Sequence, residues 1–195
     1  MKISSKMTRG LAFGFVAMML ITAFSVLAFP ASAMPEENTT DLAPLSVVRH
    51  AAATAYYEGK IYVFGGETAP AWGTVLTSVL IYDIATGLTT RGTDMPTGVA
   101  AAAYARAANG TMYVIGGVNL SAGTYPLVTQ IYDPDTDSWS SGAAPPSEIG
   151  RSASTIGIDG RIYIFGNGWN PSQTLIYNPV SVSYTHLTLP TKRIV

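Results

Sequence analysis

The sequence predicts an all-β protein that is built from a repeated, four-stranded antiparallel unit. The 195 residues include 19 glycines, 12 prolines and 11 tyrosines but only 12% charged residues, a composition typical of turn-rich β-structure. A glycine-ended apolar run recurs as IYVFGG, MYVIGG and IYIFGNG, with its first glycine at positions 65, 116 and 166. A fixed period of about fifty residues indicates repeated supersecondary units.

The first 33 residues have the pattern of a signal peptide. Three cations precede an uncharged apolar run at 11–29, and the A-x-A spacing at 31–33 fits cleavage by signal peptidase. The alternative is an uncleaved anchor helix, because about 19 apolar residues can just span a bilayer. Both interpretations predict an exported protein, which is secreted, periplasmic or at the cell surface. The polar, Pro-containing residues 34–47 are expected to form a linker.

Charge and cysteine content exclude several function classes. Beyond residue 33 the chain holds 8 Lys and Arg against 12 Asp and Glu, so nothing indicates a nucleic-acid partner. Membrane contact is expected only through the N-terminal segment, if it stays uncleaved. The absence of cysteine excludes thiolate nucleophiles, Cys-based zinc sites and haem attached through Cys.

The repeat divides the folded part into units at 48–98 and 99–149 and a partial unit at 150–182. Each unit begins with a strand of small residues, which suits a strand crowded near a central axis. A hairpin and a third strand follow, and a fourth strand is expected at 87–91 and 137–141. We expect two-residue type I′ turns in the hairpins, at the dipeptides Glu58-Gly59, Asn109-Gly110 and Asp159-Gly160, of which Glu58 is the poorest fit.

These units resemble the kelch repeat, a resemblance that covers about residues 48 to 180. It implies a kelch-type β-propeller fragment of about three four-stranded antiparallel blades, the third incomplete, after the N-terminal signal or anchor helix. Two positions depart from the pattern, Thr89 in place of Trp and Asn167 in place of the second glycine. The marker positions are Gly65, Gly66, Gly116, Gly117, Gly166, Tyr82, Tyr132, Tyr177 and Trp139.

Two other interpretations, a phosphate-binding loop and a calcium-binding loop, fit the sequence less well than a structural repeat. A phosphate-binding loop after Gly65-Gly66 would need a Lys and a helix start, and the doublet recurs in several units. The alternating acids Asp133, Asp135 and Asp137 lack the Gly and Glu of a calcium loop, so we expect a turn there. No metal and no cofactor are predicted.

The number of units and the C-terminal segment raise a further question. Propellers close with about four to eight blades, so we expect either a piece of a longer propeller or several chains in one ring. Residues 183–195 have no counterpart in the earlier units, and we predict that this atypical tail is not native. The alternative is a divergent closing strand, because SYTHLTL alternates.

Catalysis has little support in the sequence. Outside the atypical tail the chain has one histidine, His50, which we expect to be structural. The kelch resemblance includes copper radical oxidases, whose site needs a Tyr–Cys cross-link that a cysteine-free chain cannot form. Whether the protein is an enzyme stays open, with a non-enzymatic role favoured.

Binding is predicted at the loops between the second and third strands of each unit, at 67–77, 118–126 and 168–173. Aromatic residues in these loops and cations at the start of inner strands fall on one end of the scaffold, where recognition usually occurs. The alternative is that the tryptophans cover neighbouring blades. The candidate residues are Arg49, Trp72, Arg106, Tyr125, Arg151 and Trp169.

The primary functional hypothesis is an exported module that binds a protein or glycan ligand without catalysis of its own. The resemblance also implies an alternative, a truncated secreted sugar epimerase of the sialic-acid type, with Arg49, Arg106 and Arg151 in an axial pocket. A third alternative is a structural ring of several short chains.

Overall fold

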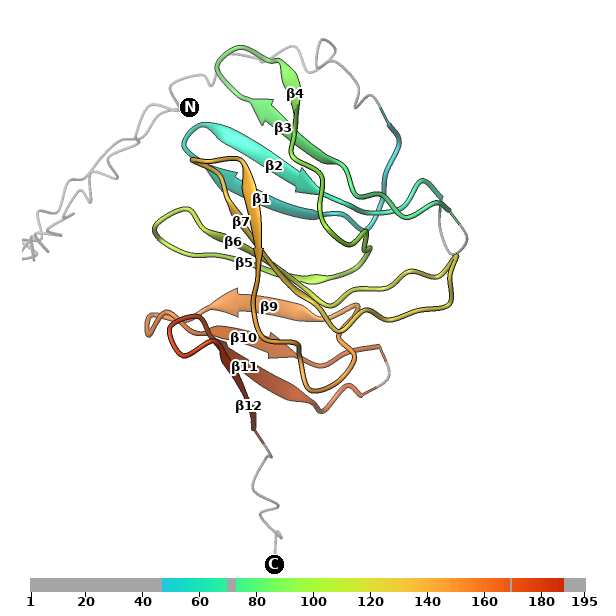
Figure 1. Cartoon of the computed structure of the whole chain (residues 1–195), viewed down its shortest axis with the longest axis vertical. Coiled ribbons are helices and arrows are strands. Elements are labelled where there is room, and N and C mark those ends of the chain that lie inside the picture. The colour runs from blue at the N-terminus through green and yellow to red at the C-terminus, as the bar shows by residue number, and fades with distance from the viewer. Residues whose placement is uncertain (1–46, 70–72, 169, 188–195) are drawn as a thin grey trace, which may run out of the picture. The chain divides into compact units, whose positions relative to one another are not determined.

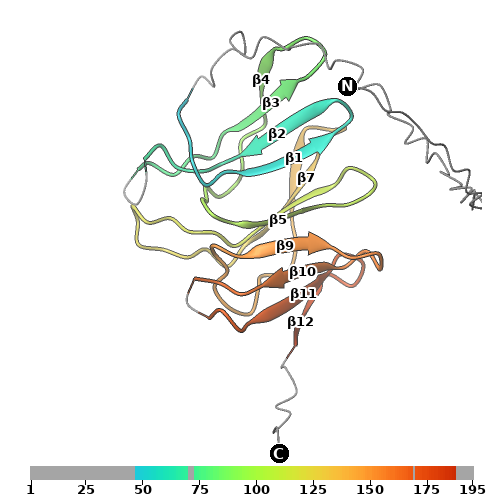
Figure 2. The same cartoon turned by 180° about the vertical axis from the view of Figure 1, so that it is seen from behind.

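A computed structural model describes residues 47–69, 73–168 and 170–187, and in these ranges the regular structure consists of three four-stranded antiparallel sheets, here called blades (Figures 1 and 2). The expected all-β class is therefore confirmed, and neighbouring strands follow the chain order in each sheet. No helix in these ranges has the length and apolarity to cross a membrane. The predicted signal peptide and almost all of the linker lie outside them.

Blades 1 and 2 each contain the strands of one sequence unit, whereas blade 3 contains those of the partial unit 150–182 and one strand beyond it. Blade 1 comprises β1 (Ala53–Tyr57), β2 (Lys60–Phe64), β3 (Val79–Asp83) and β4 (Thr89–Gly92). Blade 2 comprises β5 (Ala103–Arg106), β6 (Met112–Ile115), β7 (Thr129–Asp133) and β8 (Ser138–Ser141). Blade 3 comprises β9 (Ala153–Ile156), β10 (Ile162–Phe165), β11 (Thr174–Asn178) and β12 (Ser183–Leu187).

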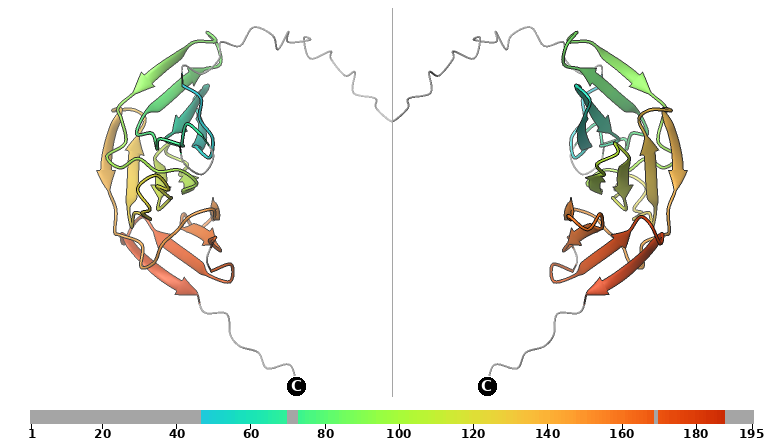
Figure 3. Two further views of the ribbon diagram at one scale, coloured as in Figure 1. Left: turned by 90° about the vertical axis from the view of Figure 1, so that its right-hand side faces the viewer. Right: turned by 90° about the vertical axis from the view of Figure 1, so that its left-hand side faces the viewer.

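The first strands of the blades lie together, as their small residues predict. The strand β5 contacts both β1 and β9, and Figure 3 shows these three strands on one side of the blades and β4, β8 and β12 on the other. The backbone N–H of Ala101 donates to Ala51 O, and that of Arg151 donates to Ala101 O, both at 2.8 Å. All three residues have positive φ, between 49° and 57°. A repeated backbone hydrogen bond thus joins successive blades.

The glycine doublets join each blade to the next, which confirms their structural interpretation. The N–H of Gly66 donates to Val99 O, and that of Gly117 donates to Ile149 O. Gly116 has φ 63°, and a Cβ there would lie 2.5 Å from Ile149 O. Only glycine combines this φ with so close an approach to another backbone.

The hairpin turns differ from the expectation in two of three cases. Both residues of Glu58-Gly59 have positive φ, as a type I′ turn requires. In the second hairpin only Gly110 does, and Ala107 pairs with Thr111 around a three-residue loop. The third hairpin repeats that pattern. The Asn or Asp side chain accepts a hydrogen bond from the N–H two residues on, which favours this loop with its glycine bulge.

Alternating side chains of β6 fill the two interfaces between blades. Met112 and Val114 pack in the core between blades 1 and 2, whereas Tyr113 and Ile115 pack in the core between blades 2 and 3. Each of these residues is buried. Because successive side chains of a strand point to opposite faces, one four-residue strand supplies both cores.

Aromatic pairs on the third and fourth strands pack against the preceding blade. Tyr132 is the cross-strand partner of Trp139, and its ring centroid lies 5.4 Å from that of Phe64 in blade 1. The indole N–H of Trp139 donates to Thr93 O at 2.9 Å. A Tyr and an aromatic residue seven positions later therefore hold blade 2 to its predecessor.

The fourth strand of blade 3 lies in the segment that the sequence analysis assigned to an atypical tail. Residues 183–187 form β12, a strand that the partial unit 150–182 did not include. Tyr184 pairs with Tyr177 across the strands, as Trp139 pairs with Tyr132. This geometry is that of the divergent closing strand, while the non-native origin of the segment stays a prediction.

Candidate functional site

The long connections lie at one end of the blades, opposite the tight hairpin turns (Figure 1). They are the β2–β3, β6–β7 and β10–β11 loops and the links from the fourth strand of one blade to the first strand of the next. This end is called the loop end below. At the loop end the chain forms loops and links rather than strands, so side chains from several of these segments can line one site.

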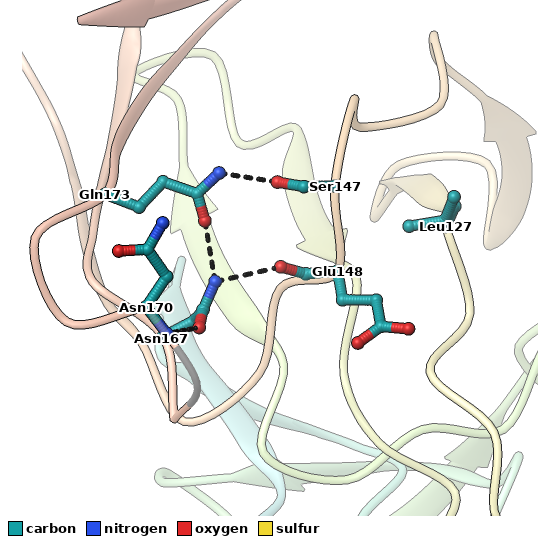
Figure 4. A pocket seen from close by; sticks show the side chains of 6 residues that line it. All are labelled: Leu127, Ser147, Glu148, Asn167, Asn170 and Gln173. Atoms are coloured by element: carbon teal, nitrogen blue, oxygen red, sulfur yellow. Dashed lines mark hydrogen bonds between the residues drawn. The ribbon is translucent and has the colours of Figure 1, made fainter. Parts of the chain in front are cut away.

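A groove of about 380 Å³ opens at the loop end between blades 2 and 3. In the view of Figure 4 the link into blade 3, with Ser147 and Glu148, runs between the β10–β11 loop and the stretch that carries Leu127. The lining is unusually rich in amides for such a small site. The residues that line it are Leu127, Ser147, Glu148, Asn167, Asn170 and Gln173.

Side-chain amides tie the two walls of the groove together. The amide of Asn167 donates to Glu148 O at 3.1 Å and to Gln173 Oε1 at 2.6 Å. Gln173 is buried, and its amide donates to Ser147 Oγ at 2.5 Å. These bonds fix the β10–β11 loop against the link into blade 3, so this part of the groove is formed before any ligand arrives.

Polar groups remain for a ligand. Glu148 is exposed, and within the described ranges its carboxylate takes part in no hydrogen bond or ion pair with protein. Asn170 is also exposed, and its carbonyl accepts a bond from Ser172 while the amide N–H₂ stays available. Leu127, 45% exposed, adds an apolar surface. An anionic acceptor, an amide and an apolar wall suit a neutral ligand that carries hydroxyl groups.

Two of the predicted aromatic residues, Trp72 and Trp169, lie outside the described residues. Tyr125 is half-buried in the β6–β7 loop, two residues before Leu127. It therefore lies on a loop that contributes to the groove, although it does not line the groove itself.

Arg49 holds backbone rather than facing a pocket. Its guanidinium donates to Gly65 O at 3.0 Å and to Ser78 O and Oγ at 3.1 and 3.0 Å. Burial, with a smaller contribution from nearby Arg91, lowers the pKa of Arg49. The side chain thus fixes the ends of β2 and β3 to the start of the inner strand.

The other two arginines lie at different ends of their blades. Arg106 ends β5 at the tight-turn end, where it donates to Ala107 O and lies 5.8 Å from the centre of the Tyr57 ring. Arg151 precedes β9 at the loop end and is exposed, with Gly168 beside its side chain. The described structure therefore does not gather Arg49, Arg106 and Arg151 into one axial pocket.

His50 has a partner that sequence reasoning missed. Its Nε2 lies 3.3 Å from Oε1 of Glu67, whose side chain is 4% exposed. The corresponding bridged pair of blade 2 is Ala100 and Val118, so the fold itself does not require this polar pair. The signal available in the sequence was Glu67, a charged residue at the position where the second unit has Val118.

The groove was also missed at the sequence level, because its walls come from separate units. The available signal was Asn167, which stands where the other units have their second glycine. The alternating acids act in a turn, as expected: Asp133 accepts a bond from the N–H of Asp135, and Asp137 accepts bonds from Thr93 N–H and Tyr132 OH. In the described ranges, no three metal-ligating side chains gather in one place.

Comparisons with known proteins identify the repeat. Residues 49–96 match the sequence model of the Kelch motif. The solved structure of YjhT aligns with a TM-score of 0.61 at 20% identity, over 74% of this chain and 53% of that one. The chain thus spans about half the length of this structure. No curated protein sequence matches significantly. Blade 1 thus carries the kelch motif, and the likeness to the YjhT structure together with three successive sheets of one design gives the described part of the chain the fold of three β-propeller blades.

Proposed function

We propose that this chain is an exported, non-catalytic binding module that takes a neutral glycan in the groove between blades 2 and 3. The observation that carries the proposal is a groove in which the amides of Asn167 and Gln173 already have protein partners, whereas the Glu148 carboxylate has none in the described ranges. A carboxylate accepts hydrogen bonds from two neighbouring hydroxyl groups, and an amide both donates and accepts. The apolar side chain of Leu127 can cover the C–H face of a sugar ring.

The groove favours a neutral ligand over an anionic one. Glu148 lines the groove, and its carboxylate would repel an anionic ligand. The epimerase alternative depends on a cationic pocket, and of its three arginines only Arg151 is exposed at the loop end. A glycan is preferred to a protein partner because the groove, of about 380 Å³, is small.

The test is isothermal titration of the full chain with a panel of neutral mono- and disaccharides. A sugar that binds should lose at least about tenfold in affinity, or about 1.4 kcal/mol, in Glu148→Gln, because a charge-assisted hydrogen bond becomes a neutral one. Asn170→Ala should weaken the same sugar. The matched control is Glu58→Gln, an exposed Glu in the turn at the opposite end.

Absence of binding across the panel would contradict the proposal. So would a sugar that binds Glu148→Gln as tightly as it binds the unchanged chain. Equal losses in Glu148→Gln and Glu58→Gln would place the sugar elsewhere and would also sink the groove as its site.

A further inference from the structure

Blade 3 has a second sheet face, which is largely open in the described ranges, although Ile176 at its centre is buried. In β10, Ile162 and Ile164 point into the core shared with blade 2, so Tyr163 and Phe165 point the opposite way. Phe165 is 48% exposed, an unusual value for a Phe in the middle strands of a sheet. The outer face of blade 3 is defined here as Ala153, Thr155, Tyr163, Phe165 and Ile176.

The equivalent faces of the other two blades have nearly the same residues and are covered by the next blade. Tyr62 and Phe64 of blade 1 stack with ring centroids 6.3 Å apart and planes at 11°, and both are buried. Tyr163 and Phe165 stack in the same way, at 6.4 Å and 14°. The equivalent set is Ala53, Ala55, Tyr62, Phe64 and Ile81 in blade 1 and Ala103, Ala105, Tyr113, Ile115 and Ile131 in blade 2.

The residues that cover the equivalent faces of blades 1 and 2 indicate which kind of surface would fit the outer face of blade 3. Phe64 is covered by Tyr132 and Trp139, at 5.4 and 5.6 Å between ring centroids. Tyr113 is covered by Tyr177, at 6.0 Å. The occupant is in both cases a β-sheet face whose third strand presents a tyrosine.

Blade 1 presents such a face on the side away from blade 2. Tyr82 is the equivalent of Tyr132, and it shares this side with Ile61 and Val63, which point opposite to Tyr62 and Phe64. These three residues are partly exposed. The outer face of blade 3 therefore resembles the faces that are covered by a neighbouring blade, and the Tyr82 side of blade 1 resembles the faces that cover them.

We propose that the outer face of blade 3 binds the Tyr82 face of blade 1 in a second copy of this chain, head to tail. The interface continues one that the chain already forms twice, between blades 1 and 2 and between blades 2 and 3. Because its two sides differ, it is heterologous, and such an interface gives a ring when the rotation closes. The described blades of two copies add up to six, within the range of about four to eight at which propellers close.

The first test is the molar mass of the full chain, measured by light scattering after size exclusion over a range of micromolar concentrations. The expected result is a dimer that dissociates on dilution. Phe165→Asp and Tyr82→Asp should each reduce the mass to that of the monomer, because each places a charge in an apolar interface. Ile158→Asp is the matched control: Ile158 is fully exposed in a hairpin turn and lies outside both faces.

The second test is complementation, which also guards against variants that fail to fold. A mixture of Phe165→Asp and Tyr82→Asp chains still holds one intact outer face and one intact Tyr82 face, so a one-to-one dimer should reappear. A monomeric unchanged chain would overturn the proposal. Association that Phe165→Asp leaves intact, or a mixture that stays monomeric, would overturn it as well.

Discussion

The ring of Tyr184 lies 4.9 Å from that of Tyr177 at an interplanar angle of 45°. The pair in blade 2, Tyr132 and Trp139, has the same separation and an angle of 47°. The hydroxyl of Tyr184 shares a 2.6 Å hydrogen bond with Thr129 Oγ1 of blade 2, just as Trp139 bonds to the backbone of blade 1. A tyrosine thus replaces the tryptophan as the residue that holds a fourth strand to the preceding blade.

Tyr184→Ala should destabilise the protein by about 2 kcal/mol, since it removes a packed ring and a hydrogen bond between blades. Urea unfolding measures the change. Thr185→Ala is the control, because Thr185 is an exposed neighbour on the other face of the same strand. Equal effects of the two substitutions would show that the ring contributes nothing specific.

Gly116→Ala should cost more stability than Gly123→Ala, although the two glycines have nearly the same φ, 63° and 65°. A Cβ at Gly116 would lie 2.5 Å from Ile149 O, whereas a Cβ at Gly123 would meet nothing within 4 Å. The second substitution isolates the cost of positive φ, about 1 kcal/mol. The difference in unfolding free energy then measures the close approach between blades, and equal costs would contradict it.

Asp137 should make stability depend on acid pH. Burial raises the pKa of its carboxyl, but the hydrogen bonds from Tyr132 OH and Thr93 N–H outweigh burial and leave the pKa below its ordinary value. A depressed pKa contributes stability above the unfolded value of about 4, and this stability is lost as pH falls through the folded value. The Asn in Asp137→Asn tolerates the positive φ of this position.

The unfolding free energies of the unchanged chain and Asp137→Asn should therefore differ most near neutral pH and converge below about pH 4. Chemical denaturation at a series of pH values gives the comparison. A difference that stays constant from neutral to acid pH would show that the carboxylate charge has no part in the network.

The His50–Glu67 pair allows a test in which blade 1 is given the residues of blade 2. His50→Ala alone should cost about 2 kcal/mol, because it leaves the buried Glu67 carboxylate without its partner. The double change His50→Ala with Glu67→Val reproduces Ala100 and Val118 and should restore stability. A double-mutant cycle by urea unfolding measures the coupling. Additive losses would show that the two side chains are independent.

The sequence predicted the parts of the fold that repeat, because each unit carries the same local chemistry. The glycine doublets and the inner strands of small residues follow from alignment of the units, whereas Tyr132 and Trp139 were marked through the kelch resemblance. The turn types did not follow, since the Asn109 side chain accepts a hydrogen bond from the N–H of Thr111, which favours a longer loop. Glu58, the poorest fit by propensity, adopts the two-residue turn.

The candidate site was only partly predictable, because contacts between blades have no local signature. Two loops beside the groove were singled out, but Glu148 lies in the link between blades 2 and 3, and Gln173 donates a hydrogen bond to Ser147 of that link. Arg49 was singled out for its charge, whereas its guanidinium bonds to three atoms of a neighbouring loop. Such long-range partners become visible only when the chain is folded.

The hydrogen bonds that run from Arg151 N–H to Ala101 O and from Ala101 N–H to Ala51 O involve main-chain atoms alone. The side chain at that position can be an alanine or an arginine without a change in how the blades meet. The bond that joins successive blades is therefore independent of the side chain at this position. Position 151, which is exposed at the loop end, can accordingly be varied to change the surface presented there while the blades keep their mutual placement.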